Sequence, residues 1–139
     1  MGLFTNLFPA KAPAAHPPAG QHELVYLMDT GKYQIEILGE ASCQAILEGL
    51  AGPRRPQGVK CYEKAFLKLE DQNAVRVEIQ RQLVGYLSPE MASFIRQQLT
   101  LRGRPKGVVE CPAVIRGGWL SSEGKTTPYE VSLDLPLAS

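Results

Sequence analysis

Glu70-Asp71-Gln72-Asn73-Ala74-Val75 and, shortly after it, Leu83-Val84-Gly85-Tyr86-Leu87 carry most of the information about the fold of this chain. The first stretch is an acidic, amide-rich turn that leads into alternating apolar and charged residues at 75–79, a pattern typical of a half-buried strand. Gln80-Arg81 is short enough to be a tight turn, so the second stretch is expected to return as the partner strand of a β-hairpin. This order of elements predicts a β-rich fold.

Further alternating segments lie on both sides of this hairpin. Strands are predicted for residues 32–38, 59–69, 75–79, 83–87, 108–116 and 129–135. In the first of these, Tyr33, Ile35 and Ile37 are expected on one side. Within 59–69 the expectation is that Tyr62 and Phe66 lie on the face opposite to Lys64 and Lys68. Because proline has no N–H to give to a ladder, Pro112 is expected to restrict its strand to an edge or a bulge.

Two helices are predicted between these strands. Residues 41–50 place apolar side chains at helical spacing, and Ser42 is a candidate N-cap. Ser88-Pro89-Glu90 is a strong start for the second helix, with serine at the cap and proline in the first turn. Five or six strands with two helices predict a mainly β, α+β domain, built as a small, OB-like, partly open barrel.

Size, charge and cysteine content narrow the function classes. The chain has 139 residues, which fits one domain, and its net charge of +1 means that a nucleic-acid role would depend on a local patch. Three widely spaced cysteines, without metal-ligand spacing to the histidines, indicate reduced thiols in a cytoplasmic protein and no metal site. No apolar run reaches the roughly 18 residues of a membrane span.

The first 21 residues differ in composition from the rest. Leu3, Phe4, Leu7 and Phe8 would share one face of a short helix, and a Pro/Ala-rich linker follows them. Two interpretations stay open: a docking peptide for the groove of a protein partner or for a membrane surface, or a frayed tail. Residues 1–21 are therefore assigned to a flexible tail and 22–139 to the globular domain.

The order of motifs resembles the HIRAN domain, found at the N-terminus of fork-remodelling helicases and as stand-alone bacterial proteins. The resemblance extends from about residue 33 to 135. It implies a modified OB-type barrel with two helices and, from the helicase-attached members, binding of single-stranded DNA with recognition of a free 3′ end. The matching residues are Ile37-Leu38-Gly39-Glu40, Gln44-Ala45-Ile46-Leu47, Leu50-Ala51-Gly52, Asp71-Gln72-Asn73-Ala74-Val75, Val84-Gly85-Tyr86-Leu87, Pro112-Ala113-Val114-Ile115 and Gly117-Gly118-Trp119.

This chain departs from the family pattern at the DNA-end pocket. Ala41-Ser42-Cys43 stands where the DNA-binding members carry an arginine and two tyrosines. Since stacking on an aromatic ring contributes roughly 1–3 kcal/mol per base, tight 3′-end capture is not expected. The resemblance places Asp71 near the terminal nucleotide and Tyr86 where the helicases have a histidine beside the DNA. A turn aspartate and a half-buried strand-end tyrosine are the structural alternatives.

Two loops carry the basic residues, Arg54 and Arg55 in one and Arg102, Arg104 and Lys106 in the other. If the loops converge they form a positive patch, and otherwise they are solvated charges. Trp119 is a candidate base platform or a lid on the core.

The leading hypothesis is a non-catalytic module that binds single-stranded DNA or DNA ends weakly. The alternative is a protein-interaction domain that has lost DNA-end recognition. No catalytic triad, phosphate loop or cofactor motif is present in the sequence, so neither catalysis nor a cofactor is expected.

Overall fold

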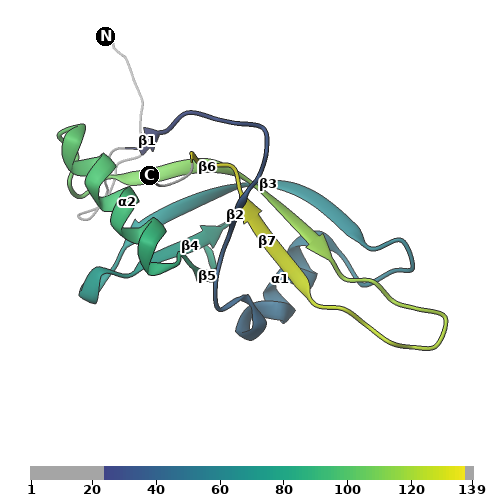
Figure 1. Cartoon of the computed structure of the whole chain (residues 1–139). Helices are drawn as coiled ribbons and strands as arrows, with labels where there is room; N and C mark the ends of the chain where they lie inside the picture. Colours follow the sequence, from purple (N-terminus) through teal and green to yellow (C-terminus); the bar gives the residue numbers. More distant parts are fainter. Residues whose placement is uncertain (1–23, 137–139) are drawn as a thin grey trace, which may run out of the picture.

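Seven strands form a single sheet in the computed structural model, which describes residues 24–136 (Figure 1). In chain order the elements are β1 (Leu24–Tyr26), β2 (Ile35–Glu36), the 3-10 helix η2 (Glu40–Cys43), α1 (Gln44–Ala51), β3 (Val59–Leu69), the 3-10 helix η3 (Asp71–Asn73), β4 (Val75–Ile79), β5 (Gln82–Tyr86), α2 (Pro89–Leu101), β6 (Val108–Gly117) and β7 (Tyr129–Leu133). The strand order is β2-β7-β6-β3-β4-β5, and β1 pairs in parallel with β6. The apolar tail segment predicted at Leu3 to Phe8 lies outside the described residues.

The sheet curls until its two edge strands meet at one point. Leu38, just after β2, exchanges both backbone hydrogen bonds with Tyr86 of β5, at 2.7 and 2.8 Å. This single bridge joins the edges of a partly open barrel, which confirms the predicted mainly β, OB-like fold with two helices. Gly85 allows the contact, because a Cβ there would lie 2.5 Å from the Leu38 carbonyl oxygen.

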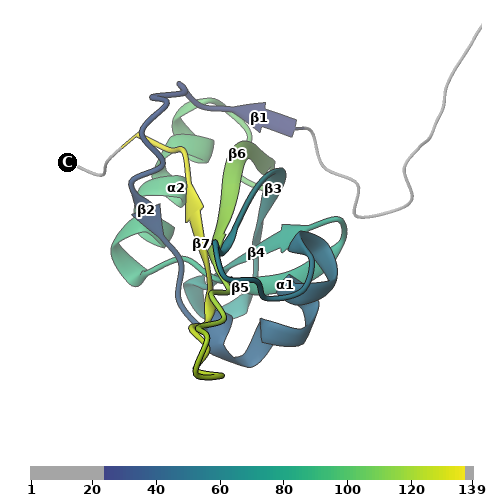
Figure 2. The same cartoon turned by 90° about the vertical axis from the view of Figure 1, so that its right-hand side faces the viewer.

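One apolar core fills the barrel. Leu67, Val77 and Ile115 of the sheet are fully buried, together with Leu47 of α1 and Ile95 of α2. The two helices lie well apart in both views, α1 against β3, β5 and β7 and α2 against η3 (Figures 1 and 2). Within residues 24–136, neither α1 nor α2 covers the outward face of β3, where Lys60, Tyr62 and Lys64 are exposed.

The hairpin that dominated the sequence prediction has the expected form. Gln80 and Arg81 have φ of 51° and 66°, as a two-residue turn between twisted strands requires, and Asn73 at 67° also adopts left-handed backbone. A register shift between Val77 and Glu78 adds a bulge to the β4–β5 ladder. Ser88 caps α2 by accepting a hydrogen bond from the Met91 amide at 3.3 Å. The predictions for this hairpin and for the start of α2 are therefore confirmed.

Two local predictions near the N-terminus are wrong. The strand expected over 32–38 is reduced to Ile35–Glu36, because Tyr33 has a φ of 51° that breaks the extended backbone. Ser42 is not an N-cap: it lies inside η2, and α1 begins after Cys43 without a side-chain cap. The chain enters α1 through a 3-10 turn that starts at Gly39, so the sequence signal for a cap was misplaced.

Pro112 does not restrict β6 to an edge. β6 pairs with β3 from Val109 to Gly117 and with β7 from Ala113 onward. The Pro112 carbonyl accepts a hydrogen bond from the Asp134 amide at 2.9 Å, so its backbone polar groups face the β7 side rather than β3. On this side of β6, the pairing with β1 ends at Glu110 and the pairing with β7 begins at Ala113. Pro112 lies between the two ladders, so its missing N–H costs no ladder hydrogen bond.

Candidate nucleic-acid interface

The outward face of β3 carries alternating aromatic and basic side chains. Strand geometry sends every second residue to the same face, and with Ala65 and Leu67 in the core the even-numbered positions point outward. These positions are Lys60, Tyr62, Lys64, Phe66 and Lys68. The sequence prediction that the aromatic and basic residues lie on opposite faces is therefore wrong. One uncovered surface presents both.

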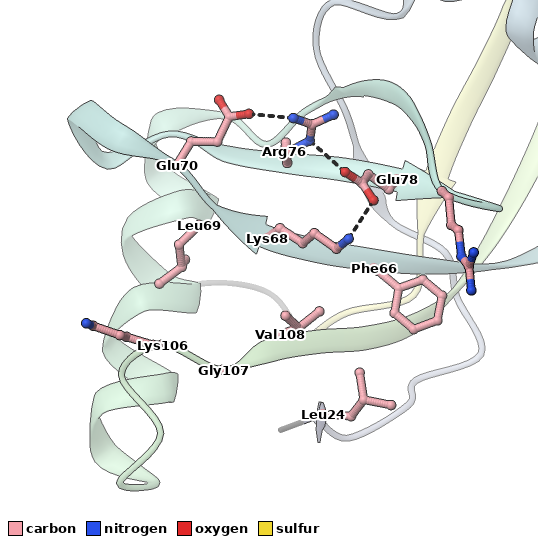
Figure 3. Close-up of a pocket in the computed structure, with 11 residues that line it drawn as sticks. Leu24, Phe66, Lys68, Leu69, Glu70, Arg76, Glu78, Lys106, Gly107 and Val108 are labelled. Atoms are coloured by element: carbon pink, nitrogen blue, oxygen red, sulfur yellow. Dashed lines mark hydrogen bonds and ion pairs between the residues drawn. The ribbon is translucent and has the colours of Figure 1, made fainter. Parts of the chain in front are cut away.

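A groove of about 810 Å³ opens on this face where β1, β3, β4 and β6 lie side by side. Phe66 points into it from β3, and Leu24 of β1 and Val108 of β6 add apolar surface (Figure 3). Lys106, in the loop that leads to β6, lies at the rim on the same side as Leu69. An aromatic ring in an open groove with basic residues along its border is the arrangement with which OB-type proteins hold single strands.

A chain of ion pairs crosses the border formed by β3 and β4. Lys68 Nζ lies 2.8 Å from Glu78 Oε1, and Arg76 Nη1 lies 3.0 Å from Glu70 Oε2 (Figure 3). Arg76 Nε is 2.8 Å from the second Glu78 oxygen, but its N–H is not aligned for a hydrogen bond. Two cations and two carboxylates thus neutralise one another in this chain.

The remaining cations decide the charge of the groove. Arg81 and Lys106 line it, and no carboxylate of residues 24–136 forms an ion pair with either. With Lys68, Arg76, Glu70 and Glu78 counted, the lining carries a net charge of +2. An anionic ligand that also offers an apolar or aromatic surface fits this combination best.

We compared the chain with protein-family models, curated proteins and solved structures. No match was found in any of the three comparisons. The HIRAN resemblance stays a prediction, and functional conclusions depend on the geometry of this surface. Within residues 24–136 no helix is long and apolar enough to cross a membrane, and no group of three potential metal-ligating side chains occurs.

None of the three residues predicted from the resemblance lines the groove, although Asp71 follows Glu70 and Tyr86 pairs with Arg76, both of which line it. Ser42 is exposed in η2, where its amide donates to the Gly39 carbonyl at 3.2 Å. Gly39 in turn adjoins Tyr86, since a Cβ on Gly39 would lie 3.9 Å from Tyr86 Cδ1. Ser42 and Tyr86 therefore flank the same glycine at the point of barrel closure.

Asp71 is exposed in the turn between β3 and β4. Its carboxylate accepts no hydrogen bond from any residue in the described part of the chain, which argues against the interpretation as a turn-stabilising aspartate. Tyr86 is half-buried and pairs across the ladder with Arg76. None of Ser42, Asp71 and Tyr86 lines the groove.

The two basic loops do not converge. The loop with Arg54 and Arg55 adjoins the end of the β3–β6 ladder where Val59 pairs with Gly117, and the Arg102–Lys106 loop adjoins the other end. Leu67 lies eight residue steps along β3 from Val59, a span of roughly 26 Å at about 3.3 Å per step. Of the five predicted basic residues, only Lys106 lines the groove. Arg102 and Arg104 are exposed in the same loop.

Arg54 has a structural role instead. Its Nε donates to the Thr127 carbonyl at 3.1 Å, and its guanidinium carbon lies 4.9 Å from the centre of the buried Tyr129 ring. Trp119 is 48% exposed and lies over Gly58, where a Cβ would come within 2.7 Å of the indole. It covers a backbone turn, not the barrel core, and it is remote from the groove.

Sequence reasoning did not find Phe66 and Arg81 as site residues. The alternation of Lys60, Tyr62, Lys64, Phe66 and Lys68 is visible in the sequence, and assigning the faces by strict period two would have revealed it. Arg81 could not have been found this way, because it lies in the turn between β4 and β5 and only the folded structure places it at the groove.

Proposed function

We propose that this protein is a non-catalytic module that binds single-stranded nucleic acid on the uncovered face of its sheet. The observation that supports the proposal most is the groove that holds Phe66 and is also lined by Arg81 and Lys106, next to a strand that alternates aromatic and lysine side chains. In this proposal a base stacks on Phe66 while the two cations contact the backbone phosphates on either side.

The charges of the groove imply weak and salt-dependent binding. Because Glu70 and Glu78 already neutralise Arg76 and Lys68, only about two phosphates gain an unpaired cation. For single strands, log K falls with log salt concentration with a slope of about −0.7 per neutralised phosphate, so a slope of about −1.4 is expected. Such a contact suits any base, since every base has a face that can stack.

Recognition of a 3′ end is not part of the proposal. Ser42 offers neither a stacking ring nor a cation, and it lies beside Tyr86 at the barrel closure rather than in the groove. We therefore expect internal stretches and ends of a single strand to bind alike. This differs from the activity that the HIRAN resemblance implies for the helicase-attached members.

Fluorescence anisotropy with a labelled twelve-nucleotide oligothymidylate tests the proposal. Replacing Phe66 by leucine keeps the groove apolar but removes the stacking ring, and binding should weaken about fivefold or more, the equivalent of at least about 1 kcal/mol. The double variant Arg81→Gln/Lys106→Gln should bring the salt slope close to zero. Lys125→Gln is the matched control, because it removes one positive charge from an exposed loop outside the groove.

Two outcomes would contradict the proposal. One is absence of binding at low salt, and the other is unchanged affinity of the Phe66→Leu variant. A comparison of oligonucleotides with a 3′-hydroxyl and a 3′-phosphate distinguishes binding in the groove from binding at a DNA-end pocket. Equal affinity is expected, and a clear preference for the free hydroxyl would assign binding to the region of Ser42, Asp71 and Tyr86 instead.

A further inference from the structure

A second pocket lies on the same uncovered face, toward the opposite end of β3 from the first groove. Its volume is about 570 Å³, and three tyrosines line it: Tyr26 from β1, Tyr33 from the loop before β2 and Tyr62 from β3. Its ionisable lining residues are Asp29, Glu63, Glu110 and Lys64. The Glu63 carboxylate lies on the other face of β3, where it accepts a hydrogen bond from Cys61 Sγ at 3.5 Å, so Asp29, Glu110 and Lys64 give the pocket a net charge of −1. The two pockets thus have opposite charge, so a ligand that suits one is disfavoured in the other.

The tyrosine walls are open to solvent and arranged for contact. Tyr26 and Tyr62 are 62% and 58% exposed, which is unusual for large aromatic side chains that share one pocket. The Tyr33 and Tyr62 rings meet edge to face, with centres 5.6 Å apart. The Tyr26 hydroxyl donates to Glu110 Oε1 at 3.0 Å and so orients this carboxylate.

Hydrogen bonds to Asp134 fix the loop that carries Asp29 and Tyr33. The buried Asp134 carboxylate accepts hydrogen bonds from the Thr30 hydroxyl, from the Thr30 amide at 3.0 Å and from the Gly31 amide at 2.8 Å. This anchor holds Tyr33 at a φ of 51°, a conformation that bulky side chains rarely adopt. Backbone strain of this kind persists where surrounding contacts impose it, and it is often found at ligand sites.

Two lysine side chains of this protein already contact residues that line the pocket. Lys60 Nζ lies 5.7 Å from the centre of the Tyr62 ring, and Lys64 Nζ lies 3.3 Å from Glu110 Oε2. Both lysines are exposed, so these contacts are weak and can be displaced. The Asp29 carboxylate has no ion pair or hydrogen bond with any residue from 24 to 136, which leaves a negative charge for a ligand.

We propose that the tyrosine pocket binds the guanidinium group of an arginine side chain presented by a partner protein. A guanidinium stacks on tyrosine faces and donates in a fork to carboxylates, so it uses both features of the lining at once. The compact ammonium of a lysine matches only the charge, and the phosphates of a nucleic acid meet repulsion from the Asp29 and Glu110 carboxylates. This inference is independent of the nucleic-acid proposal, which concerns the other pocket.

Two-dimensional amide NMR on the full chain, titrated with acetyl-Gly-Arg-Gly-amide, tests this inference. We expect shifts at Tyr26, Asp29 and Tyr62, and binding at least about tenfold weaker for the same peptide with neutral citrulline in place of arginine. Asp29→Asn should weaken binding about fivefold, the equivalent of about 1 kcal/mol. Glu123→Gln is the control that removes an exposed carboxylate outside the pocket and should change nothing.

Lys64→Gln distinguishes the two classes of ligand. It removes a cation that competes for Glu110, so an arginine ligand should bind more tightly to this variant, whereas an anionic ligand should bind less tightly. The inference is overturned if the arginine and citrulline peptides bind equally or if Lys64→Gln weakens the arginine peptide. It is also overturned if an oligothymidylate, and not the peptide, shifts the amides of Tyr26 and Tyr62. That result would make this pocket part of a nucleic-acid track.

Discussion

Replacement of Gly85 by alanine should open the barrel where its edge strands meet. The new methyl carbon would lie 2.5 Å from the Leu38 carbonyl oxygen and 2.7 Å from Ile37 Cδ1. Neither contact is tolerable, and one involves backbone that cannot rotate away. Leu38 must therefore move, and both of its hydrogen bonds with Tyr86, at 2.7 and 2.8 Å, lengthen or break.

The expected loss of stability follows from two contributions. Overpacking of a tight site costs about 1–3 kcal/mol. Each of the two disrupted backbone hydrogen bonds adds about 1 kcal/mol at most, since part of the bonding is regained from water. A total of about 3 kcal/mol corresponds to a fall in the melting temperature of roughly 10 °C for a domain of this size.

Thermal unfolding followed by circular dichroism measures this effect, with Gly49→Ala as the matched control. Gly49 is exposed within α1, and a Cβ there meets no atom within 4 Å. Alanine favours the helix by about 0.5–1 kcal/mol, so the control should unfold at a slightly higher temperature. A Gly85→Ala variant that melts within about 2 °C of the unmodified protein would refute the assigned closure of the barrel at Leu38 and Tyr86.

Three further predictions concern buried groups. Burial raises the pKa of the Asp134 carboxyl, but hydrogen bonds, chiefly from Thr30, outweigh it, and the pKa lies below its ordinary value. The ionised Asp134 carboxylate therefore stabilises the fold above about pH 4, and this stabilisation is lost as the pH falls through the folded-state pKa. The difference in melting temperature between the unmodified protein and Asp134→Asn should be greatest near pH 7 and should shrink in acid. Burial raises the pKa of the Cys111 thiol to about 12, so iodoacetamide at pH 8 should leave Cys111 unmodified until the protein unfolds, and rapid labelling of the folded protein would contradict this. Tyr129→Phe removes a buried hydrogen bond of 2.6 Å to the Gly52 carbonyl and should cost about 1–2 kcal/mol in urea unfolding, whereas an unchanged midpoint would show that the hydroxyl does not stabilise the fold.

Local signals predicted the part of the fold that depends on local physics. The β4–β5 hairpin followed from alternation around Gln80-Arg81, and both residues do adopt left-handed backbone. Ser88 caps α2 as its position before Pro89 indicated. In both places neighbouring residues alone determine the geometry, which is why the sequence was sufficient.

Long-range pairing explains most of what the sequence could not predict. The parallel pairing of β1 with β6 brings Tyr26 opposite Glu110. No sequence feature near either residue predicts this pairing. The rule that confines proline to edges did not apply to Pro112, because β6 has different neighbours on its second side before and after that residue. Such outcomes depend on which strands arrive from elsewhere in the chain.

The candidate site also combines features that the sequence could predict with features that required the structure. The even-numbered face of β3 was within reach of the sequence, and only the assignment of faces was wrong. The groove itself required the structure, because Phe66, Arg81 and Lys106 come together from separate segments. The sequence left open whether the two basic loops converge, and the structure places them at opposite ends of the β3–β6 ladder.

The most direct test of the central claim is an amide NMR titration of the full chain with an oligothymidylate at low salt. We expect the shifts to concentrate at Phe66, Arg81 and Lys106 around the groove and to fade as salt is added. Shifts that concentrate at Ser42, Asp71 and Tyr86 would contradict it and favour the DNA-end pocket implied by the HIRAN resemblance. The absence of any shift at low salt would contradict nucleic-acid binding altogether.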